Sequence, residues 1–375
     1  MAATKVLIVD DSALIRQMLE EMLSSDPMIE VVGTAADPYV AREKIKQLHP
    51  DVLTLDIEMP RMDGLTFLKN LMRLHPLPVI MVSTLTESGA DVTFEALEIG
   101  AVDFVTKPKI NVKNTFEDYR EEICSKVRMA SRVSKTMLER RYQRYSQNPQ
   151  PSSKQQPIKP LAPVAQRRSL DDVLGQNKST HRAFRETDKI IALGASTGGT
   201  EAIKEVLVNL TAQTPAMVIT QHIPAAFSLP FAKRMDTVSA MTVCQAEDGQ
   251  AILPGHVYIA PGDQHLMIAR EGARYVCRLN DGPPVNRHKP SVDVMFRSVL
   301  ENVGPNAICV LLTGMGNDGA QGMKELQALN VPTIAQDEKT SVVWGMPGEA
   351  VKLGAANDIL PITSIASRIL ALAET

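Results

Sequence analysis

The first third of the chain alternates short apolar runs with helical patterns, and this alternation limits the fold more than any other feature. Five of the apolar runs have the length and composition of strands. Strands separated by helices predict a doubly wound parallel sheet, because parallel neighbours need a crossover connection. The expected strands are 5–9, 30–35, 52–55, 78–82 and 103–106, and the expected helices are 12–23, 38–47, 64–73 and 89–99.

A second α/β pattern begins at residue 189, so the 375 residues suit two domains that each bury a core. We predict a larger, Rossmann-like domain with another doubly wound parallel sheet and an added β-hairpin. The hairpin pairs 265–270 with 274–279 and turns at Glu271 and Gly272. The other expected strands are 189–193, 216–220, 242–245, 257–260 and 308–312, and the expected helices are 200–210, 291–302, 319–329 and 348–353.

The composition changes between the two patterns. Residues 146–183 contain no aromatic residue and five prolines among Gln, Ser, Lys and Arg. Such a stretch cannot bury enough apolar surface to offset its ordering entropy, so we predict a flexible linker, preceded by a charged helical pattern at 116–141. The predicted division is a first domain at 1–125, a helical extension and linker at 126–187, and a second domain at 188–375.

Charge and cysteine content restrict the cellular setting. The formal net charge is −3, so no global field indicates nucleic acid as a partner. No apolar run reaches the length of about 18 residues that a membrane span needs, and the N-terminus shows no signal-peptide pattern. The four cysteines are scattered, which is typical of free thiols in a reducing compartment. We therefore expect a cytoplasmic protein without direct membrane insertion.

Acidic residues stand where predicted strands of the first domain end. Asp10 and Asp11 follow the first strand, and Asp56 follows the third. The carboxyl ends of parallel strands meet at one edge of a sheet, so these carboxylates are expected to cluster. Crowded carboxylates repel one another unless a hard cation lies between them, which predicts a Mg²⁺ site. A lone Asp after a strand is usually a helix N-cap, but the joint pattern argues against that reading.

The same strand ends carry the groups that phosphoryl transfer needs. Asp56 is the central carboxylate and therefore the natural nucleophile, and Glu58 would lend a backbone carbonyl to the metal. Ser83 ends the fourth strand. Lys107 ends the fifth, where its ammonium would hold phosphoryl oxygens. We expect Asp56 to accept a phosphoryl group with Mg²⁺ as cofactor.

These motifs resemble those of a two-component response-regulator receiver, which has a flavodoxin-like fold. They are Val-Asp-Asp-Ser at 9–12, Leu-Asp-Ile-Glu-Met-Pro at 55–60, Met-Asp-Gly at 62–64, Ser83, and Lys-Pro at 107–108. The resemblance implies that a histidine kinase phosphorylates Asp56 while Asp10 and Asp11 hold Mg²⁺. It also makes Phe104, with Ser83 and Lys107, part of a conformational switch. Without the resemblance, Phe104 fits an ordinary half-buried strand aromatic equally well.

A serine stands on a predicted strand-to-helix turn of the second domain, in the run Gly-Ala-Ser-Thr-Gly-Gly at 194–199. The flanking glycines permit a tight turn that exposes the Ser196 hydroxyl. The helix N-terminus that follows offers free N–H groups for an oxyanion. By itself this run also fits a phosphate-binding or nucleotide-binding loop, so its partners decide between the two readings.

Two partners for Ser196 follow other predicted parallel strands. His222 comes after the strand at 216–220, and Asp318 comes after the strand at 308–312. A serine hydroxyl needs a neutral imidazole to take its proton, and that imidazole needs a carboxylate to orient it. The three strand ends should meet in one crevice, which predicts a Ser-His-Asp triad that needs no cofactor.

Other histidines and acids compete for the same roles. His256 and His265 flank later strands but follow no core parallel strand, and His288 lies in a polar loop where binding is favoured over base catalysis. His49 and His75 lie in the first domain and His181 in the linker. For the carboxylate, the alternatives are Asp281 and Asp293.

Residues 188 to 375 resemble the catalytic domain of chemotaxis protein-glutamate methylesterases, the CheB family. The matching stretches are 194–199, Gln-His-Ile-Pro at 221–224, Tyr-Ile-Ala-Pro-Gly at 258–262, Pro-Ser-Val-Asp at 290–293, 314–319, and Trp-Gly-Met-Pro at 344–347. The resemblance implies Ser196 as nucleophile, His222 as base, Asp318 as its partner, and oxyanion groups at Thr197 and Met315. The implied substrates are glutamyl methyl esters and glutamines of methyl-accepting chemoreceptors, met at membrane receptor clusters during chemotactic adaptation.

We expect the receiver to cover the esterase crevice until Asp56 is phosphorylated. Two other classes of protein compete with this reading. A transcriptional regulator would need a basic recognition helix, which the second half lacks. A nucleotide-binding module is disfavoured because the phosphate-loop signature is absent while His222 and Asp318 are well placed.

Overall fold

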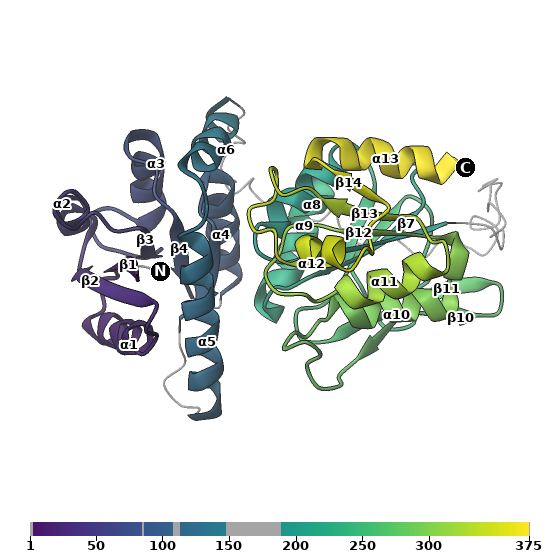
Figure 1. Ribbon diagram of the computed structural model, residues 1–375, viewed down its shortest axis with the longest axis horizontal. Coiled ribbons are helices and arrows are strands. Elements are labelled where there is room, and N and C mark those ends of the chain that lie inside the picture. The colour runs from purple at the N-terminus through teal and green to yellow at the C-terminus, as the bar shows by residue number, and fades with distance from the viewer. Residues whose placement is uncertain (1–2, 85, 108–112, 148–188, 375) are drawn as a thin grey trace, which may run out of the picture.

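The computed structural model describes residues 3–84, 86–107, 113–147 and 189–374, and Figure 1 shows two sheet-centred halves side by side. The strands of the first half are β1 (Thr4–Val9), β2 (Ile29–Ala35), β3 (Val52–Asp56), β4 (Val79–Ser83) and β5 (Asp103–Thr106). They pair in parallel in the order β2-β1-β3-β4-β5. This order confirms the predicted doubly wound sheet. The chain adds β2 on one side of β1 and then adds β3, β4 and β5 on the other side.

Helices connect these strands, and their N-termini are capped by side chains of the preceding loops. They are α1 (Ala13–Ser24), α2 (Pro38–Leu48), α3 (Gly64–Leu74) and α4 (Glu87–Ile99). The Ser12 hydroxyl accepts from the Ile15 amide, and the Asp63 carboxylate accepts from the Thr66 amide. Such caps satisfy amides that the helix itself leaves free, so the loops at the carboxyl ends of the strands have defined positions.

The charged pattern predicted as one helical stretch at 116–141 forms two helices. Helix α5 (Lys113–Ala130) crosses the predicted domain boundary at residue 125, and α6 (Lys135–Gln147) turns back along α3 and α4. The fully buried Leu138 anchors α6 there, and the Lys69 ammonium lies 5.9 Å from the ring centre of Tyr145. The helical extension is therefore part of the first half. The predicted linker from 148 to 187 lies outside the described residues.

The second half contains a seven-stranded parallel sheet in the order β14-β13-β12-β6-β7-β9-β8, confirming the predicted fold class. A separate antiparallel hairpin pairs β10 with β11 as expected, and Gly272 at its turn has φ +62°. The bounds are β6 (Ile190–Ala195), β7 (Ala216–Gln221), β8 (Thr242–Gln245), β9 (His256–Ile259), β10 (His265–Glu271), β11 (Arg274–Asn280), β12 (Ala307–Leu311), β13 (Thr333–Gln336) and β14 (Asp358–Leu360).

The helices of this half are α8 (Gly199–Leu207), α9 (Ala225–Val238), α10 (Val292–Asn302), the 3₁₀ turn η1 (Gly304–Asn306), α11 (Ala320–Ala328), α12 (Met346–Lys352) and α13 (Ile362–Glu374). Four of them, α8, α10, α11 and α12, correspond to the helices expected at 200–210, 291–302, 319–329 and 348–353, whereas α9, α13, β13 and β14 were missed in the sequence. Helix α9 was overlooked because Pro230, inside it, normally argues against a helix. Strands β13 and β14 are too short to show a clear alternation, and α13 had no prediction.

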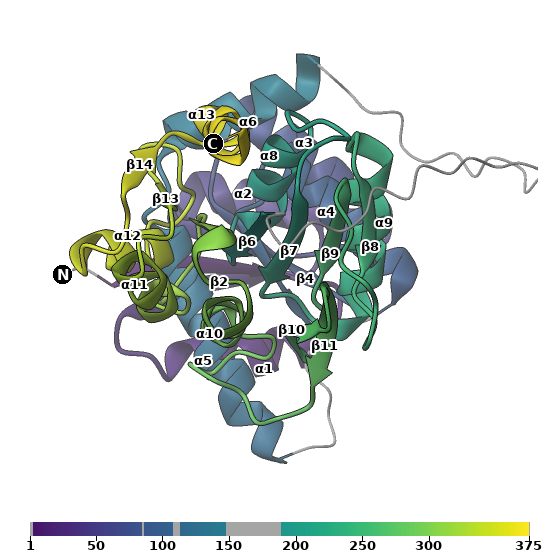
Figure 2. The same cartoon turned by 90° about the vertical axis from the view of Figure 1, so that its right-hand side faces the viewer.

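The two halves meet through helices α4, α8 and α9, in an arrangement that Figures 1 and 2 show from two sides. The buried Phe94 ring of α4 lies 6.1 Å from the Phe227 ring and 5.6 Å from the Phe231 ring, both in α9. The Phe104 ring of β5 stacks on Phe227 with centroids 4.7 Å apart. Aromatic burial therefore holds this interface together.

Charged residues surround the aromatic contacts. The Glu98 carboxylate of α4 pairs with the Lys204 ammonium and, at 2.7 Å, with the Arg234 guanidinium of the second half. The Glu98 side chain is only 8% exposed, so this pairing is shielded from solvent. No helix in the described ranges combines the length and the apolar character that crossing a membrane would require.

Candidate active site and phosphorylation site

Ser196 lies on the turn that joins β6 to α8. The turn is tight: the Gly199 amide donates to the Ser196 carbonyl at 2.7 Å, and Gly198 has φ +75°. A side chain at Gly198 would also bring a Cβ within 2.6 Å of the Val342 side chain, so the position suits only glycine. The turn leaves Ser196 partly exposed at the carboxyl end of the strand.

His222 lies beside Ser196 at the end of the neighbouring strand. Ala195 of β6 pairs with Gln221 of β7, so the two candidate residues are the next ones along adjacent parallel strands. The His222 amide donates to the Ala195 carbonyl at 3.1 Å. Parallel strands run about 4.8 Å apart, so the two backbones approach within one strand spacing.

Gln221 ties the two candidate residues together, and the sequence reasoning missed it. Its buried side-chain amide donates to the Ser196 carbonyl at 2.9 Å and to the His222 carbonyl at 3.0 Å. A polar residue at the end of an otherwise apolar strand was the signal that could have found it. The contacts add a side-chain link between the two loops to the backbone bond from His222 to Ala195.

Asp318 accepts a hydrogen bond from the imidazole of His222, with 2.9 Å between Oδ2 and Nε2. The carboxylate is 1% exposed and accepts from four further donors at the N-terminus of α10 and in the preceding loop. These are the Val292 amide at 2.7 Å, the Ser291 hydroxyl and the Asn286 side-chain amide at 2.8 Å, and the Asp293 amide at 3.2 Å.

The donors keep Asp318 charged. Burial alone would raise the pKa of Asp318, but the hydrogen bond and charge of His222, with the Asn286 and Val292 donors, hold that pKa well below its usual range. A permanent carboxylate at Nε2 leaves the other ring nitrogen of His222 for proton exchange. That nitrogen, Nδ1, is buried and has no hydrogen-bond partner among the described residues.

The competing acids and histidines have other partners. Asp293 accepts from the Gly322 amide at 2.7 Å and Asp281 pairs with Lys289, so neither takes the place of Asp318. His265 braces the loop before α10 through the Pro283 carbonyl and the Ser291 amide. His256 bonds the Pro254 carbonyl, at the start of β9 and thus at the opposite end of the sheet.

Thr197 and Met315, the expected oxyanion residues, both contact the first half of the chain. The Thr197 hydroxyl donates to the Asp103 carboxylate of β5 at 2.5 Å. The Met315 sulfur accepts from the Ser125 hydroxyl of α5 at 3.2 Å. Both residues expected at the oxyanion site are therefore engaged by the receiver-like half. Nothing in the sequence could have indicated these pairs, which join residues 94 and 190 positions apart.

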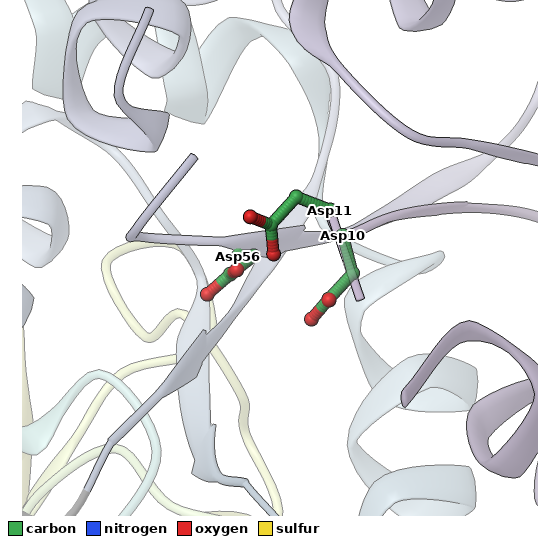
Figure 3. Close-up of side chains that lie close together, drawn as sticks. All are labelled: Asp10, Asp11 and Asp56. Carbon is green, nitrogen blue, oxygen red and sulfur yellow. The ribbon is translucent and has the colours of Figure 1, made fainter. Parts of the chain in front are cut away.

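The carboxylates of Asp10, Asp11 and Asp56 cluster at the strand ends of the first sheet, with ligand atoms within 4.8 Å of one another (Figure 3). The Lys107 ammonium lies 2.8 Å from Asp56 and 3.6 Å from Asp10. Burial, together with the charge of Asp10, raises the pKa of Asp56 to about 6 despite the contact with Lys107. A second positive charge would therefore be favoured here.

The cluster fits a magnesium ion. The Oδ2 oxygen of Asp10 is buried and has no hydrogen-bond partner among the described residues, and an oxygen-only donor set suits a hard divalent cation. The Glu58 amide donates to the Asp56 carboxylate at 3.3 Å, which keeps Glu58 beside the cluster. The Ser83 hydroxyl accepts from Thr93 at 2.9 Å and donates to the Thr84 carbonyl at 3.3 Å.

Fold and sites define a class: a five-stranded receiver-type domain with an acidic cluster at its strand ends, followed by an α/β domain with a strand-end histidine-carboxylate pair. Family comparison agrees, matching residues 6–114 to the response regulator receiver domain and residues 191–369 to the CheB methylesterase. A Hydrogenovibrio crunogenus protein named protein-glutamate methylesterase/protein-glutamine glutaminase is 68% identical over 374 residues, covering 99% of both chains. The chain therefore belongs to the CheB family of receiver-linked methylesterases.

Further relatives extend this similarity. A Xanthomonas campestris pv. campestris protein, named protein-glutamate methylesterase/protein-glutamine glutaminase 1, is 56% identical over 368 residues, covering 98% of this chain and 97% of its own. Among solved structures, the Thermotoga maritima CheB methylesterase catalytic domain is 36% identical, with a TM-score of 0.48. It covers 49% of this chain and 98% of its own.

Proposed function

We propose that this chain hydrolyses glutamyl methyl esters, and glutamine side-chain amides, on chemoreceptors through a triad of Ser196, His222 and Asp318. The observation that carries the proposal is the bond between His222 Nε2 and Asp318 Oδ2 beside the serine turn. The names of relatives that match nearly the whole chain support the substrate class. The same acyl-enzyme serves both substrates, because only the leaving group differs.

In the proposed reaction, Nδ1 of His222 takes the proton of the Ser196 hydroxyl as its oxygen attacks the substrate carbonyl carbon. The charge of Asp318 stabilises the imidazolium that forms. Groups at Thr197 and Met315 lie beside the developing oxyanion. The tetrahedral intermediate then collapses and expels methanol or ammonia, which leaves with the proton from His222. Water repeats the sequence on the ester of Ser196 and releases the glutamate carboxylate.

Phosphorylation of Asp56 by a chemotaxis histidine kinase controls this reaction in our proposal. Mg²⁺ would be held by Asp10, Asp11, Asp56 and the Glu58 carbonyl, and when bound it neutralises the charge that otherwise opposes phosphoryl transfer. Lys107 would hold the phosphoryl oxygens. The contacts of Lys107 with Asp10 and Asp56 support this role, because they place its ammonium beside the carboxylate that would be phosphorylated.

The receiver inhibits the esterase until it is phosphorylated. This proposal is supported by the contacts of Asp103 with Thr197 and of Ser125 with Met315, which engage the two residues expected at the oxyanion site. A change at Ser83 and Phe104 would reach the esterase directly, because Phe104 stacks on Phe227. The enzyme would act from the cytoplasm at membrane chemoreceptor clusters and thereby produce chemotactic adaptation.

Methanol release from methylated chemoreceptor tests the proposal. We expect Ser196→Ala to abolish release, since the acyl-enzyme can no longer form, while Ser367→Ala, a surface serine of α13, keeps the wild-type rate. A small phosphodonor with Mg²⁺ should raise the wild-type rate and leave Asp56→Asn at the basal rate. An active Ser196→Ala protein would refute the triad, and equal activation of Asp56→Asn would refute the control by phosphorylation.

A further inference from the structure

A tight turn before α10 lies against the candidate triad. Val285 and His288 exchange two backbone hydrogen bonds, of 3.0 and 2.9 Å, around Asn286 (φ 51°) and Arg287 (φ 69°). Two consecutive non-glycine residues with positive φ are costly, so the surrounding structure must hold the turn. The Asn286 side chain does so by donating to Asp318 at 2.8 Å and to Asp293 at 2.6 Å.

The turn presents the ring of His288 to the ring of His222. The two imidazoles are stacked, with centroids 3.7 Å apart and planes inclined by only 12°. Asp318 holds one edge of the His222 ring through Nε2, while His288 covers one face. An edge contact alone permits the ring to swing about that bond. The edge and face contacts together define the plane of the ring, and therefore the direction of Nδ1.

We propose that His288 is a positioning residue, whose stacked ring holds the His222 imidazole in the plane that directs Nδ1 at Ser196. This inference rests on the proposed triad and adds to it a residue outside the three, which contacts the ring of His222. It also gives the strained turn beside the site a function. The turn is bonded to Asp318 through Asn286, and it therefore sets the position of the His288 ring.

His288 acts by shape in this arrangement and does not exchange protons. Burial lowers the pKa of His288 to about 3, and the charges of His222, Lys126 and Arg287 act in the same direction, against the opposing effect of Asp318. The His288 ring is thus neutral at neutral pH. A neutral stacked ring also avoids like-charge repulsion when His222 becomes an imidazolium. A phenyl ring at position 288 should therefore fulfil the same stacking role as the imidazole.

The test compares His288→Ala with His288→Phe in the full-length chain, activated by phosphodonor and Mg²⁺. We expect His288→Ala to lower kcat about tenfold while KM for methylated receptor changes less than about twofold, because a misdirected base slows the step without weakening binding. Phosphonylation of Ser196 by a phosphonofluoridate, which releases fluoride, should slow by the same factor. His288→Phe should recover most of both rates and keep the wild-type pH profile of phosphonylation.

Controls separate this inference from the proposed function. His256→Ala removes a histidine at the opposite end of the sheet and should leave the rates unchanged. A Ser196→Ala protein that still hydrolyses the ester would refute the triad itself. If Ser196→Ala is inactive, two results would overturn the role of His288 alone. One is wild-type rates in His288→Ala, and the other is a His288→Phe protein as slow as His288→Ala, which would show that an imidazole nitrogen is needed.

Discussion

Single residues of the site carry charge that also bears on stability, and Asp318 is the clearest case. Its pKa in the folded protein is held below the value of about 3.9 expected in the unfolded chain. Above that value the ionised carboxylate stabilises the fold fully. As the pH falls below about 3.9, Asp318 is protonated in the unfolded chain but stays ionised in the folded protein, so the stabilisation declines.

Replacing Asp318 by asparagine should therefore be harmful in two measurable ways. The amide would set an NH₂ group against donors that now meet a carboxylate, so we expect a loss of about 1–3 kcal/mol in the free energy of unfolding at pH 7. The difference from wild type should narrow as the pH falls below about 4. The kcat should fall about 10³- to 10⁴-fold, as expected when a triad carboxylate is neutralised.

Urea unfolding at several pH values and ester hydrolysis measure the two effects. Asp248→Asn is the matched control, because Asp248 is an exposed carboxylate whose donors, Arg278 and the Leu279 amide, are not residues of the triad. A difference between Asp318→Asn and wild type that grows as the pH falls would contradict the sign of the pKa shift.

Among the elements, the loop after β12 packs directly against the serine turn, and the Ser196 amide donates to the Thr313 carbonyl at 3.0 Å. A Cβ added at Gly314 would lie 2.3 Å from the Met346 sulfur and 2.8 Å from the Ser196 Cβ. We expect Gly314→Ala to displace the turn, lowering kcat by about 10- to 100-fold and the free energy of unfolding by about 1–3 kcal/mol.

Gly304→Ala is the control for this prediction, measured by the same hydrolysis assay and by thermal unfolding. Gly304 has φ +59°, but a Cβ there would meet nothing within 4 Å. Its replacement should cost about 1 kcal/mol of stability through backbone strain and leave kcat unchanged. Wild-type kcat in Gly314→Ala would mean that the contact with Ser196 places no constraint on the nucleophile.

At the scale of the whole molecule, the pairing of Glu98 with Lys204 and Arg234 joins the two halves. Glu98→Ala leaves two half-buried cations, Lys204 and Arg234, without their carboxylate, so the interface should weaken. We expect the unphosphorylated enzyme to hydrolyse ester several-fold faster, by about three- to tenfold if the contact is worth about 1 kcal/mol. The fully phosphorylated rate should change little.

Glu95→Ala provides the comparison, because Glu95 lies on the same helix but pairs with Lys69 inside the receiver half. It should leave the basal rate at the wild-type level. An unchanged basal rate in Glu98→Ala would exclude this pairing as a restraint on the esterase, and a fall in both rates would indicate a folding defect, which thermal unfolding can detect.

Local patterns in the chain predicted more of the fold than of the site. The apolar runs at 190–195 and 216–221 are fully buried strands, and such runs are readable because every residue contributes to them. Helix α9 escaped because Pro230 breaks the local rule while tertiary packing of Phe227 and Phe231 compensates. The hydrogen bonds of Gln221 and the stacking of His288 on His222 could not be predicted from hydrophobic periodicity, because they depend on single polar side chains.

The sequence by itself determined two parallel sheets and which polar side chains stand at the ends of their strands, since strand alternation and chain direction are local properties. Tertiary structure decided which of those side chains meet. Asp318 reached His222 across 96 positions, and Thr197 reached Asp103 across 94. Such pairs depend on how loops and whole domains pack, because the distance between two residues far apart in the chain is set by every contact formed between them.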